Sequence, residues 1–225
     1  TSEDFVAWSF PKVVFHTDAL DNENRKRRIM ETTENPDYLT PPIIGVPPED
    51  YIAQCYQMAV MPYEGLYVGF PALYNPAGPD GEGNNTGLNQ IELTVSRDLY
   101  TWDRVADREL FIGIDPWDGV NYGTSQNLMS GCPLIRGDEI WLYYNGLRFR
   151  AYSYQHPELD PAFFNDGSAL CLAKLRLDGF VSLDAAGEGS LVTRSFLFTG
   201  AGLSVNVEAR GELRAELLDA ETGNP

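Results

Sequence analysis

Hydrophobic and polar positions alternate over short stretches through the middle of the chain. Two runs rich in aromatic and aliphatic residues, YIAQCYQMAVMP and LYVGFPALY, flank a short polar break at 63–65. Such runs around a tight turn predict an antiparallel hairpin. After a polar loop at 75–87, the alternating Ile91, Leu93 and Val95 predict a third strand, and WDRVA predicts a fourth. We therefore expect one unit of four antiparallel strands between residues 51 and 111.

A second unit repeats this order. SGCPLI and IWLYYNG flank a polar turn at 136–139, a long loop follows at 147–166, and SALCLAKLRL predicts the third strand. Asp178-Gly179 then leads into FVSL, the predicted fourth strand.

A short motif marks the repeat. Ser2-x-Asp4-x-x-x-Trp8 recurs as Ser96-x-Asp98-x-x-x-Trp102, between the third and fourth predicted strands. Aspartate accepts hydrogen bonds from its own backbone two residues on, and the tryptophan would begin the outer strand and cover the sheet edge. We therefore predict a structural role for the motif. Its first copy stands at residue 2, so we expect the chain to start inside a unit, without that unit's first three strands.

Repeated four-stranded antiparallel units predict an all-β fold and are typical of β-propeller blades. Residues 1–187 are predicted as the end of one blade and two full blades, with meanders of a sandwich as the alternative. From 188 to 225 the alternation of Leu203, Val205 and Val207 predicts the start of a C-terminal β-sandwich. ELRAELLDAE could also form a helix by propensity.

Charge narrows the choice of partners. The chain has 16 Lys and Arg against 33 Asp and Glu, a net charge of −17, which disfavours nucleic acid and anionic membranes. The basic run Arg25-Lys26-Arg27-Arg28 is predicted to be a solvated loop. An unclosed propeller would expose strand edges, so we expect an oligomer or association with missing segments of the same propeller.

No cofactor or metal is indicated by the sequence. Cys55, Cys132 and Cys171 are far apart among apolar neighbours and are predicted to be buried free thiols. Asp80, Glu82 and Asn84 alternate oxygen ligands as some calcium (Ca2+) loops do, but the full loop signature is missing, and a flexible loop is favoured.

The long loops at 16–50, 75–87, 106–127 and 147–166 would emerge on one face of a propeller, where binding sites are usually built. The inner strands would begin at the same face. The candidate sugar contacts there are Gln54, Tyr56, Trp117, Tyr122 and Asn127, and Asp118 is the candidate catalytic carboxylate. Blade packing, bound water and a simple turn at Asp118-Gly119 are the structural alternatives for these residues.

The ordered motifs SxDxxxW, PYEGLYVGFPALY, IELTVSRDLYTWDRV, GDEIWLYYNG and LAKLRLDGFVSLDAAGEGSLVTRSFLF resemble a bacterial branch of proteins related to the five-bladed β-propeller glycoside hydrolases of families 32 and 43. The resemblance implies a propeller followed by a β-sandwich, a ligand at the propeller axis, and a chain that is a fragment of the whole. It does not carry over a complete catalytic triad. Gln54 stands where related proteins often have an acidic residue, which weakens the case for hydrolysis.

Three functions therefore stay open. The first is a carbohydrate-active protein resembling a glycoside hydrolase, with an oligosaccharide or polysaccharide partner. The others are a non-catalytic carbohydrate-binding module and a structural or interaction module. The sequence leaves the compartment open between secreted, periplasmic and cytoplasmic.

Overall fold

The computed structural model describes residues 2–39, 51–79, 85–150, 160–197 and 199–224. The chain divides into two compact units, Thr1–Leu177 and Asp178–Pro225. The helices and strands of the described residues all belong to the first unit. They are α1 (Ala19–Glu34), β1 (Gln54–Tyr63), β2 (Leu66–Pro79), β3 (Asn85–Ile91), β4 (Thr94–Ser96), β5 (Asp103–Arg104), β6 (Gln126–Met129), β7 (Leu134–Arg136), β8 (Glu139–Leu147), α2 (Ala162–Asn165) and β9 (Ser168–Arg176).

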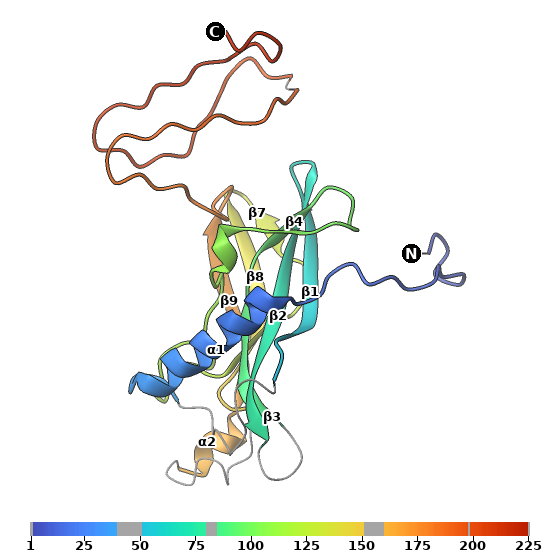
Figure 1. Cartoon of the computed structure of the whole chain (residues 1–225). Coiled ribbons are helices and arrows are strands. Elements are labelled where there is room, and N and C mark those ends of the chain that lie inside the picture. Colours follow the sequence, from blue (N-terminus) through green and yellow to red (C-terminus); the bar gives the residue numbers. More distant parts are fainter. Residues whose placement is uncertain (1, 40–50, 80–84, 151–159, 198, 225) are drawn as a thin grey trace. The chain divides into compact units, whose positions relative to one another are not determined.

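The strands form one mixed, open sheet, and the unit is mostly sheet with one long helix (Figure 1). β2 pairs antiparallel with β1 on one side and with β3 and β4 on the other, and β4 pairs with β5. β8 pairs antiparallel with β6, β7 and β9. The antiparallel order expected between residues 51 and 111 is therefore confirmed. We call β1–β5 the first meander and β6–β9 the second meander.

The two meanders are joined through one parallel pair of residues, Asn89 on β3 with Gln126 on β6. Apolar side chains of both meanders form the buried core, including Phe70, Leu73, Met129, Ile140 and Leu142. The polar loop predicted at 75–87 begins later than expected, because β2 continues to Pro79 and β3 starts at Asn85.

Helix α1 corrects the prediction of a solvated loop for 25–28 and of an unstructured connection from residue 16. Asp18 caps the helix: its carboxylate accepts from the Leu20 and Asp21 amides, and the Asp21 side chain accepts from the Asp18 amide. The helix ends before Asn35-Pro36, where proline disfavours a helical preceding residue. The buried stripe has helical spacing but is largely polar, so hydrophobic periodicity did not show it. Its members are Asp21, Asn24, Arg25, Arg28, Ile29 and Thr32.

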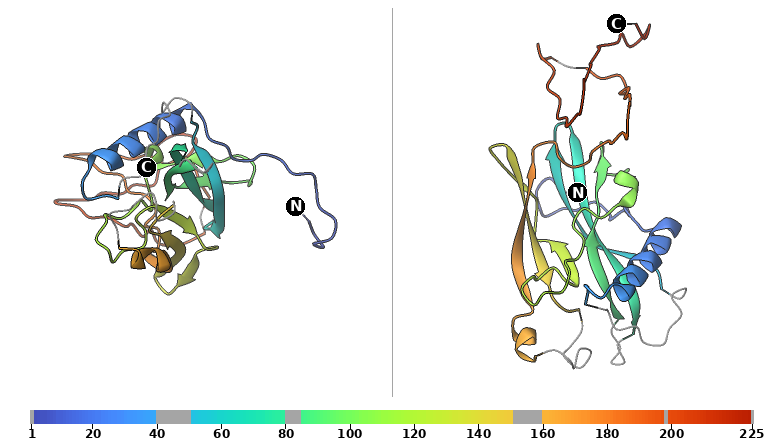
Figure 2. Two further views of the ribbon diagram at one scale, coloured as in Figure 1. Left: turned by 90° about the horizontal axis from the view of Figure 1, so that it is seen from below. Right: turned by 90° about the vertical axis from the view of Figure 1, so that its left-hand side faces the viewer.

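Apolar and polar contacts hold α1 against β2 and β3 (Figure 2). Ile29 packs with Ala77, Leu88 and the partly buried Ile114. Arg25 donates from Nη1 to the carbonyl of Pro76 at 2.8 Å. The helix therefore covers the first meander, on the side away from β8 and β9.

An ion-pair network fastens the same helix to the strands beyond β3. Arg28 on α1 donates to the buried carboxylate of Glu92 at 2.7 Å, and Arg104 on β5 bonds the other oxygen of that carboxylate. Arg104 also pairs with Asp21 at 3.0 Å. Arg108 binds both oxygens of Asp18, at 2.7 and 2.8 Å, and reaches Asp21 at 2.9 Å.

The repeated SxDxxxW motif has the same turn in both copies, which confirms the predicted role of the aspartate. Trp102 directly precedes β5 as predicted, whereas Trp8 is exposed and no strand follows it in residues 9–18. In the second copy, Oδ1 of Asp98 accepts from the Tyr100 and Thr101 amides, and Trp102 Nε1 donates to the Leu99 carbonyl. In the first copy, Oδ1 of Asp4 accepts from the Val6 and Ala7 amides, and Trp8 Nε1 donates to the Phe5 carbonyl. These amide hydrogen bonds lower the pKa of both aspartates.

The second unit differs from the expected sandwich start. Its described residues, 178–197 and 199–224, contain no helix or strand, and the residues of FVSL do not form the predicted fourth strand. Leu203, Val205 and Val207 are exposed. Alternation builds a sheet only where a partner strand supplies hydrogen bonds and a covered face, and these residues have neither in the unit itself.

The three cysteines are free, but their predicted burial is wrong for Cys132, which is exposed, while Cys55 and Cys171 are half-buried. Cys132 lies in the exposed turn before β7, where its sulfur faces the Pro133 carbonyl. None of the described helices is long and apolar enough to span a membrane.

Candidate functional site

A row of polar side chains crosses the sheet where the two meanders meet. Gln54 on β1 lies opposite Tyr74 on β2, Tyr74 lies opposite Asn89 on β3, and Asn89 lies opposite Gln126 on β6. Residues directly opposite in a sheet share one face. Tyr74, Asn89 and Gln126 are buried, whereas Gln54 is exposed. We call these four residues, with Tyr56 and Arg150, the polar row.

Tyr56 reaches the row because β1 contains a bulge. The register shifts between Cys55 and Gln57, so Tyr56 is the extra residue. Bulges re-aim a side chain and are common beside active sites. The Tyr56 ring meets the Tyr74 ring edge-on at 5.7 Å and is 54% exposed. It therefore forms the open side of the row.

Arg150 links the aromatic and amide members of the row. Its guanidinium lies 3.8 Å from the centre of the Tyr74 ring. Its Nη1 donates to Oδ1 of Asn89 at 3.0 Å and to Oε1 of Gln126 at 3.1 Å. Burial raises the pKa of Tyr74 to about 12, so this phenol stays protonated beside the guanidinium at neutral pH.

One buried donor of the row has no acceptor among the described residues. Asn89 is fully buried, and Arg150 fixes its amide orientation by donating to Oδ1. Its Nδ2 makes no hydrogen bond with the described residues. A buried amide donor without an acceptor is costly, so water or a ligand oxygen is expected to complete it.

The predicted residues Trp117, Asp118 and Tyr122 belong to a neighbouring loop, residues 115–123, organised around Arg148. Arg148 is buried and donates to the carbonyls of Gly119, Val120 and Asn121. Its guanidinium also lies 4.1 Å from the centre of the Tyr122 ring. Its contacts fix the loop on the second meander, because Arg148 directly follows β8.

Within this loop the aromatic side chains have protein partners. The Trp117 ring packs on Phe149 at 5.5 Å, and the Tyr122 hydroxyl donates to Asp166 at 2.8 Å. Phe149 immediately precedes Arg150 in the chain, so the Trp117 contact lies next to the polar row in sequence.

Asn127 faces the opposite side of β6 from the polar row, toward the same loop. Its Nδ2 donates to the carbonyls of Gly113 at 2.6 Å and Gly123 at 3.4 Å. Its Oδ1 is buried without a hydrogen-bond donor among the described residues. A Cβ at Gly123 would lie 2.9 Å from this Oδ1 and 2.7 Å from Oδ2 of Asp115. Asn127 and Asp115 therefore converge above Gly123, and only glycine fits there.

Two carboxylates of the loop have pKa values shifted in opposite directions. Burial, with a contribution from the charge of Asp118, raises the pKa of Asp115. Asp118 accepts from the Asn121 and Val120 amides at 2.8 Å each, and these bonds lower its pKa. Asp115 therefore holds a proton more readily than an ordinary aspartate, and Asp118 stays ionised.

The structure thus separates the predicted site residues into two groups. Gln54 and Tyr56 belong to the polar row, whereas Trp117, Asp118, Tyr122 and Asn127 belong to loop 115–123 and its floor. Sequence reasoning missed the residues that connect the two groups to the sheet. These are Tyr74, Asn89, Gln126, Arg148 and Arg150. The only signal for the arginines was the RFR triplet directly after a predicted strand.

Among the described residues, no group of three or more His, Cys, Asp or Glu side chains could hold a metal ion. The alternating oxygen ligands noted at 80–84 lie outside the described residues.

Comparisons with known proteins give one structural match. No protein-family model and no curated protein matches the chain. A search of solved structures finds a protein chain from a BT0996 RGII complex, with a TM-score of 0.33 and 13% sequence identity. The match covers 58% of this chain and 36% of the other, so the matched part is about a third of that protein chain. A match at this TM-score carries no argument about function.

Proposed function

We propose that the polar row binds a saccharide. The observation that carries the proposal is the strand register, which aligns amide and phenol groups from β1, β2, β3 and β6 on one face, where the Arg150 guanidinium bonds the amides. Sugars combine C–H faces that stack on aromatic rings with hydroxyls that both donate and accept hydrogen bonds. Tyr56 offers an exposed ring, and the Asn89 amide offers a buried donor for which the described part of the chain supplies no acceptor.

We further propose that the meanders are adjacent blades of a β-propeller, with β1 and β6 as their inner strands. Two observations support this architecture. Gln57 on β1 donates from Nε2 to the Met129 carbonyl on β6 at 2.6 Å, so the first strands of the two meanders are neighbours. The motif turn at Asp98 also connects β4 to β5. Because β3 and β4 both pair with β2, they count as one interrupted third strand, and the turn then leads to the fourth strand, as in a blade. The polar row would then lie beside the axis, where propellers bind ligands.

One observation favours a second function, glycoside hydrolysis. Glycosidases use two carboxyl groups, one protonated and one ionised, and opposite pKa shifts mark such pairs. Asp115 and Asp118 have these opposite shifts. The scissile bond would then lie at loop 115–123, on the side of β6 opposite the polar row. There Asp115 would protonate the leaving oxygen, and Asp118 would attack the anomeric carbon or activate water. Against it, the Asp118 carboxylate already accepts three hydrogen bonds from its own turn.

Binding is tested with an immobilised panel of neutral and acidic polysaccharides, followed by calorimetry with the best oligosaccharide. Tyr56→Ala is expected to weaken binding about tenfold, as loss of a stacked ring of roughly 1–1.5 kcal/mol implies. Tyr100→Ala is the matched control, because Tyr100 is 57% exposed but lies in the Asp98 turn. Equal affinity of both variants for the sugar, or no binding by the parent chain, refutes the proposal.

Hydrolysis is tested separately by measuring release of reducing ends from the same panel. Asp115→Asn and Asp118→Asn should each abolish release and leave calorimetric binding in place. Binding without release by the parent chain would support the module and exclude hydrolysis of the panel.

A further inference from the structure

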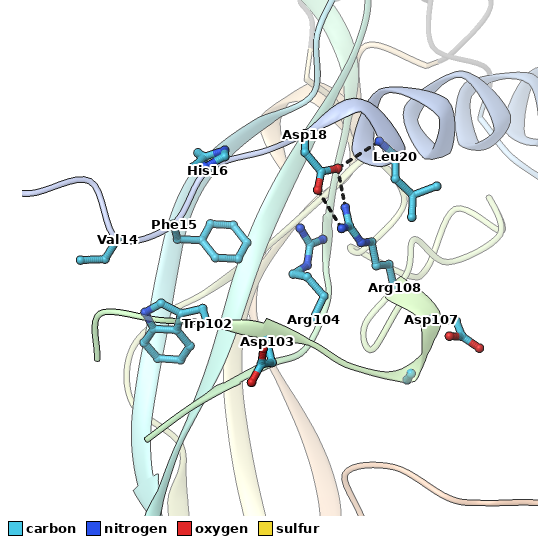
Figure 3. A pocket seen from close by; sticks show the side chains of 11 residues that line it. Val14, Phe15, His16, Asp18, Leu20, Trp102, Asp103, Arg104, Asp107 and Arg108 are labelled. Atoms are coloured by element: carbon cyan, nitrogen blue, oxygen red, sulfur yellow. Dashed lines mark hydrogen bonds and ion pairs between the residues drawn. The ribbon is translucent and has the colours of Figure 1, made fainter. Parts of the chain in front are cut away.

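A pocket of about 640 Å³ lies between the N-terminus of α1 and β5, outside the polar row (Figure 3). Its aromatic lining includes Phe15 and Trp102, and its charged lining includes Asp18, Asp103, Arg104, Asp107 and Arg108. The volume lies in the range of small-molecule sites, roughly 300–1,000 Å³. The saccharide proposal does not use any of these residues.

Negative charge is in surplus in this pocket. Both lining arginines are already paired: Arg108 with Asp18 and Asp21, and Arg104 with Asp21 and Glu92. Arg28 supplies the third guanidinium of the network. Three guanidiniums therefore face the three carboxylates of the network, Asp18, Asp21 and Glu92. The further lining carboxylates of Asp103 and Asp107 are exposed and make no ion pair with the described residues.

The backbone of this wall is strained. Ala106, Asp107 and Arg108 follow one another with φ values of 51°, 49° and 62°. Three successive non-glycine residues in the left-handed region are rare and strained. The turn directs Arg108 to Asp18 and places Asp107 on the pocket wall. Such strain persists only where the surroundings fix it, which the Arg108 ion pairs do here.

Aromatic rings on this side of the molecule already hold cations of the chain itself. Arg104 lies 5.1 Å from the centre of the Phe15 ring, and Lys12 lies 5.8 Å from the centre of the Tyr100 ring. The Trp102 ring packs toward Gly69, and its Nε1 donates to the Leu99 carbonyl. Trp102 also lines the pocket, so its ring offers apolar surface to the stem of a ligand.

An anionic ligand does not fit this site. A helix N-terminus attracts anions through free amides, but Asp18 already accepts from the amides of Leu20 and Asp21. The surplus carboxylates and the chain's net charge of −17 would repel an anion and raise the local concentration of cations.

We infer that this pocket binds an organic cation, an ammonium or guanidinium group carried on an aliphatic stem. The stem would lie along Trp102 and Phe15, and separate charged groups of the ligand would meet Asp103 and Asp107, which lie at different ends of the lining (Figure 3). A polyamine and the lysine or arginine side chain of a basic polypeptide share this chemistry.

The test is calorimetry of the full chain with two probes, spermidine and an end-blocked trilysine peptide, at constant ionic strength. The double variant Asp103→Asn with Asp107→Asn should weaken binding at least about tenfold, because both exposed carboxylates that would meet the ligand's cationic groups lose their charge. Asparagine tolerates the left-handed conformation at 107, so the turn should persist. Unchanged circular dichroism and melting temperature would verify this.

The control variant Glu34→Gln with Asp138→Asn removes two negative charges at the other end of α1 and in the β7–β8 turn. It should leave affinity within about twofold. Equal weakening of both double variants would show non-specific attraction and overturn the proposal, as would no binding of either probe at millimolar concentration. Tighter binding of spermidine would identify polyamines as the source of the cation, and tighter binding of trilysine would identify basic polypeptides. A shift of the Trp102 indole N–H resonance on titration, absent in the double variant, would place the ligand in the pocket.

Discussion

The buried carboxylate of Glu92 gives the sharpest prediction about stability. Glu92 is fully buried and accepts hydrogen bonds from two guanidiniums, those of Arg28 and Arg104. Glu92→Gln keeps the size of the side chain and removes its charge. Arg104 would keep Asp21, which also binds Arg108, whereas Arg28 would lose its ion-pair partner among the described residues.

The magnitude follows from the burial of both cations. The side chains of Arg28 and Arg104 are 3% and 11% exposed, so neither regains full hydration when its partner is lost. Breaking a buried ion pair from one side costs about 3–5 kcal/mol, because a buried charge is left uncompensated. For a unit of this size, that loss corresponds to a decrease of about 6–20 °C in melting temperature.

The assay is urea unfolding followed by circular dichroism at pH 7, with thermal melts alongside. Glu23→Gln is the control, because Glu23 pairs with Lys26 on the exposed side of the same helix. Its cost should stay below about 1 kcal/mol. In a double-mutant cycle, Arg28→Met should cost less in the Glu92→Gln background than alone, because it then removes an already unpaired charge. A cost of Glu92→Gln below about 1 kcal/mol would refute the reasoning, whereas loss of the folded signal at 25 °C would agree with it.

Three further predictions concern acid stability, packing and a buried carboxyl. Hydrogen bonds from Arg108 hold the pKa of Asp18 well below its usual range, so this carboxylate stabilises the fold above its ordinary pKa near 4, and the effect is lost as the pH falls. Asp18→Asn retains a helix cap but cannot titrate. The variant should therefore show a flatter decline in urea midpoint below about pH 4. Gly69→Ala should cost about 1–3 kcal/mol in urea unfolding, because its Cβ would lie 2.8 Å from the Trp102 ring, whereas Gly131→Ala should be near neutral, as nothing lies within 4 Å. The pKa of Asp115 is raised by burial, so its carboxylate destabilises the fold as the pH rises through that pKa; Asp115→Asn should increase the urea midpoint at pH 7 and leave it unchanged near pH 3.

The strands could be predicted because their signals are local. The hairpin at Glu64-Gly65 and the Asp98 turn depend on residues next to each other in the chain, and both form as expected. Helix α1 could not be found in this way, because its buried face carries Asp21, Arg25 and Arg28 in place of apolar residues. The partners of Asp21 and Arg28, on β5 and beyond β3, are more than 60 residues away in sequence, and Pro76, the partner of Arg25, is 51 residues away. A pattern of hydrophobic residues contains no information about such pairs.

Only part of the candidate site could be predicted, because local sequence signals locate strand starts but not long-range partners. Gln54 and Tyr56 stand at the start of a strand, which a repeat pattern can locate. Asn89 and Gln126 meet them only through strand register, and Arg150 joins them from a loop after β8. A shift of one residue in β3 would turn Asn89 to the other face, and no local rule fixes that register.

The polar row and the joint between the meanders share Asn89, Gln126 and Arg150. Backbone pairing between the meanders is limited to Asn89 with Gln126 among the described strands, and Arg150 bonds both side chains. A joint made only of apolar side chains would not respond to a polar ligand. A joint of amides and a guanidinium would respond, because the Asn89 donor has no acceptor among the described residues. A ligand that completes the donor would bind only when the meanders are docked, and binding to the folded state alone raises its stability. If the row binds a ligand as proposed, the joint would couple the packing of the two meanders to occupation of the row.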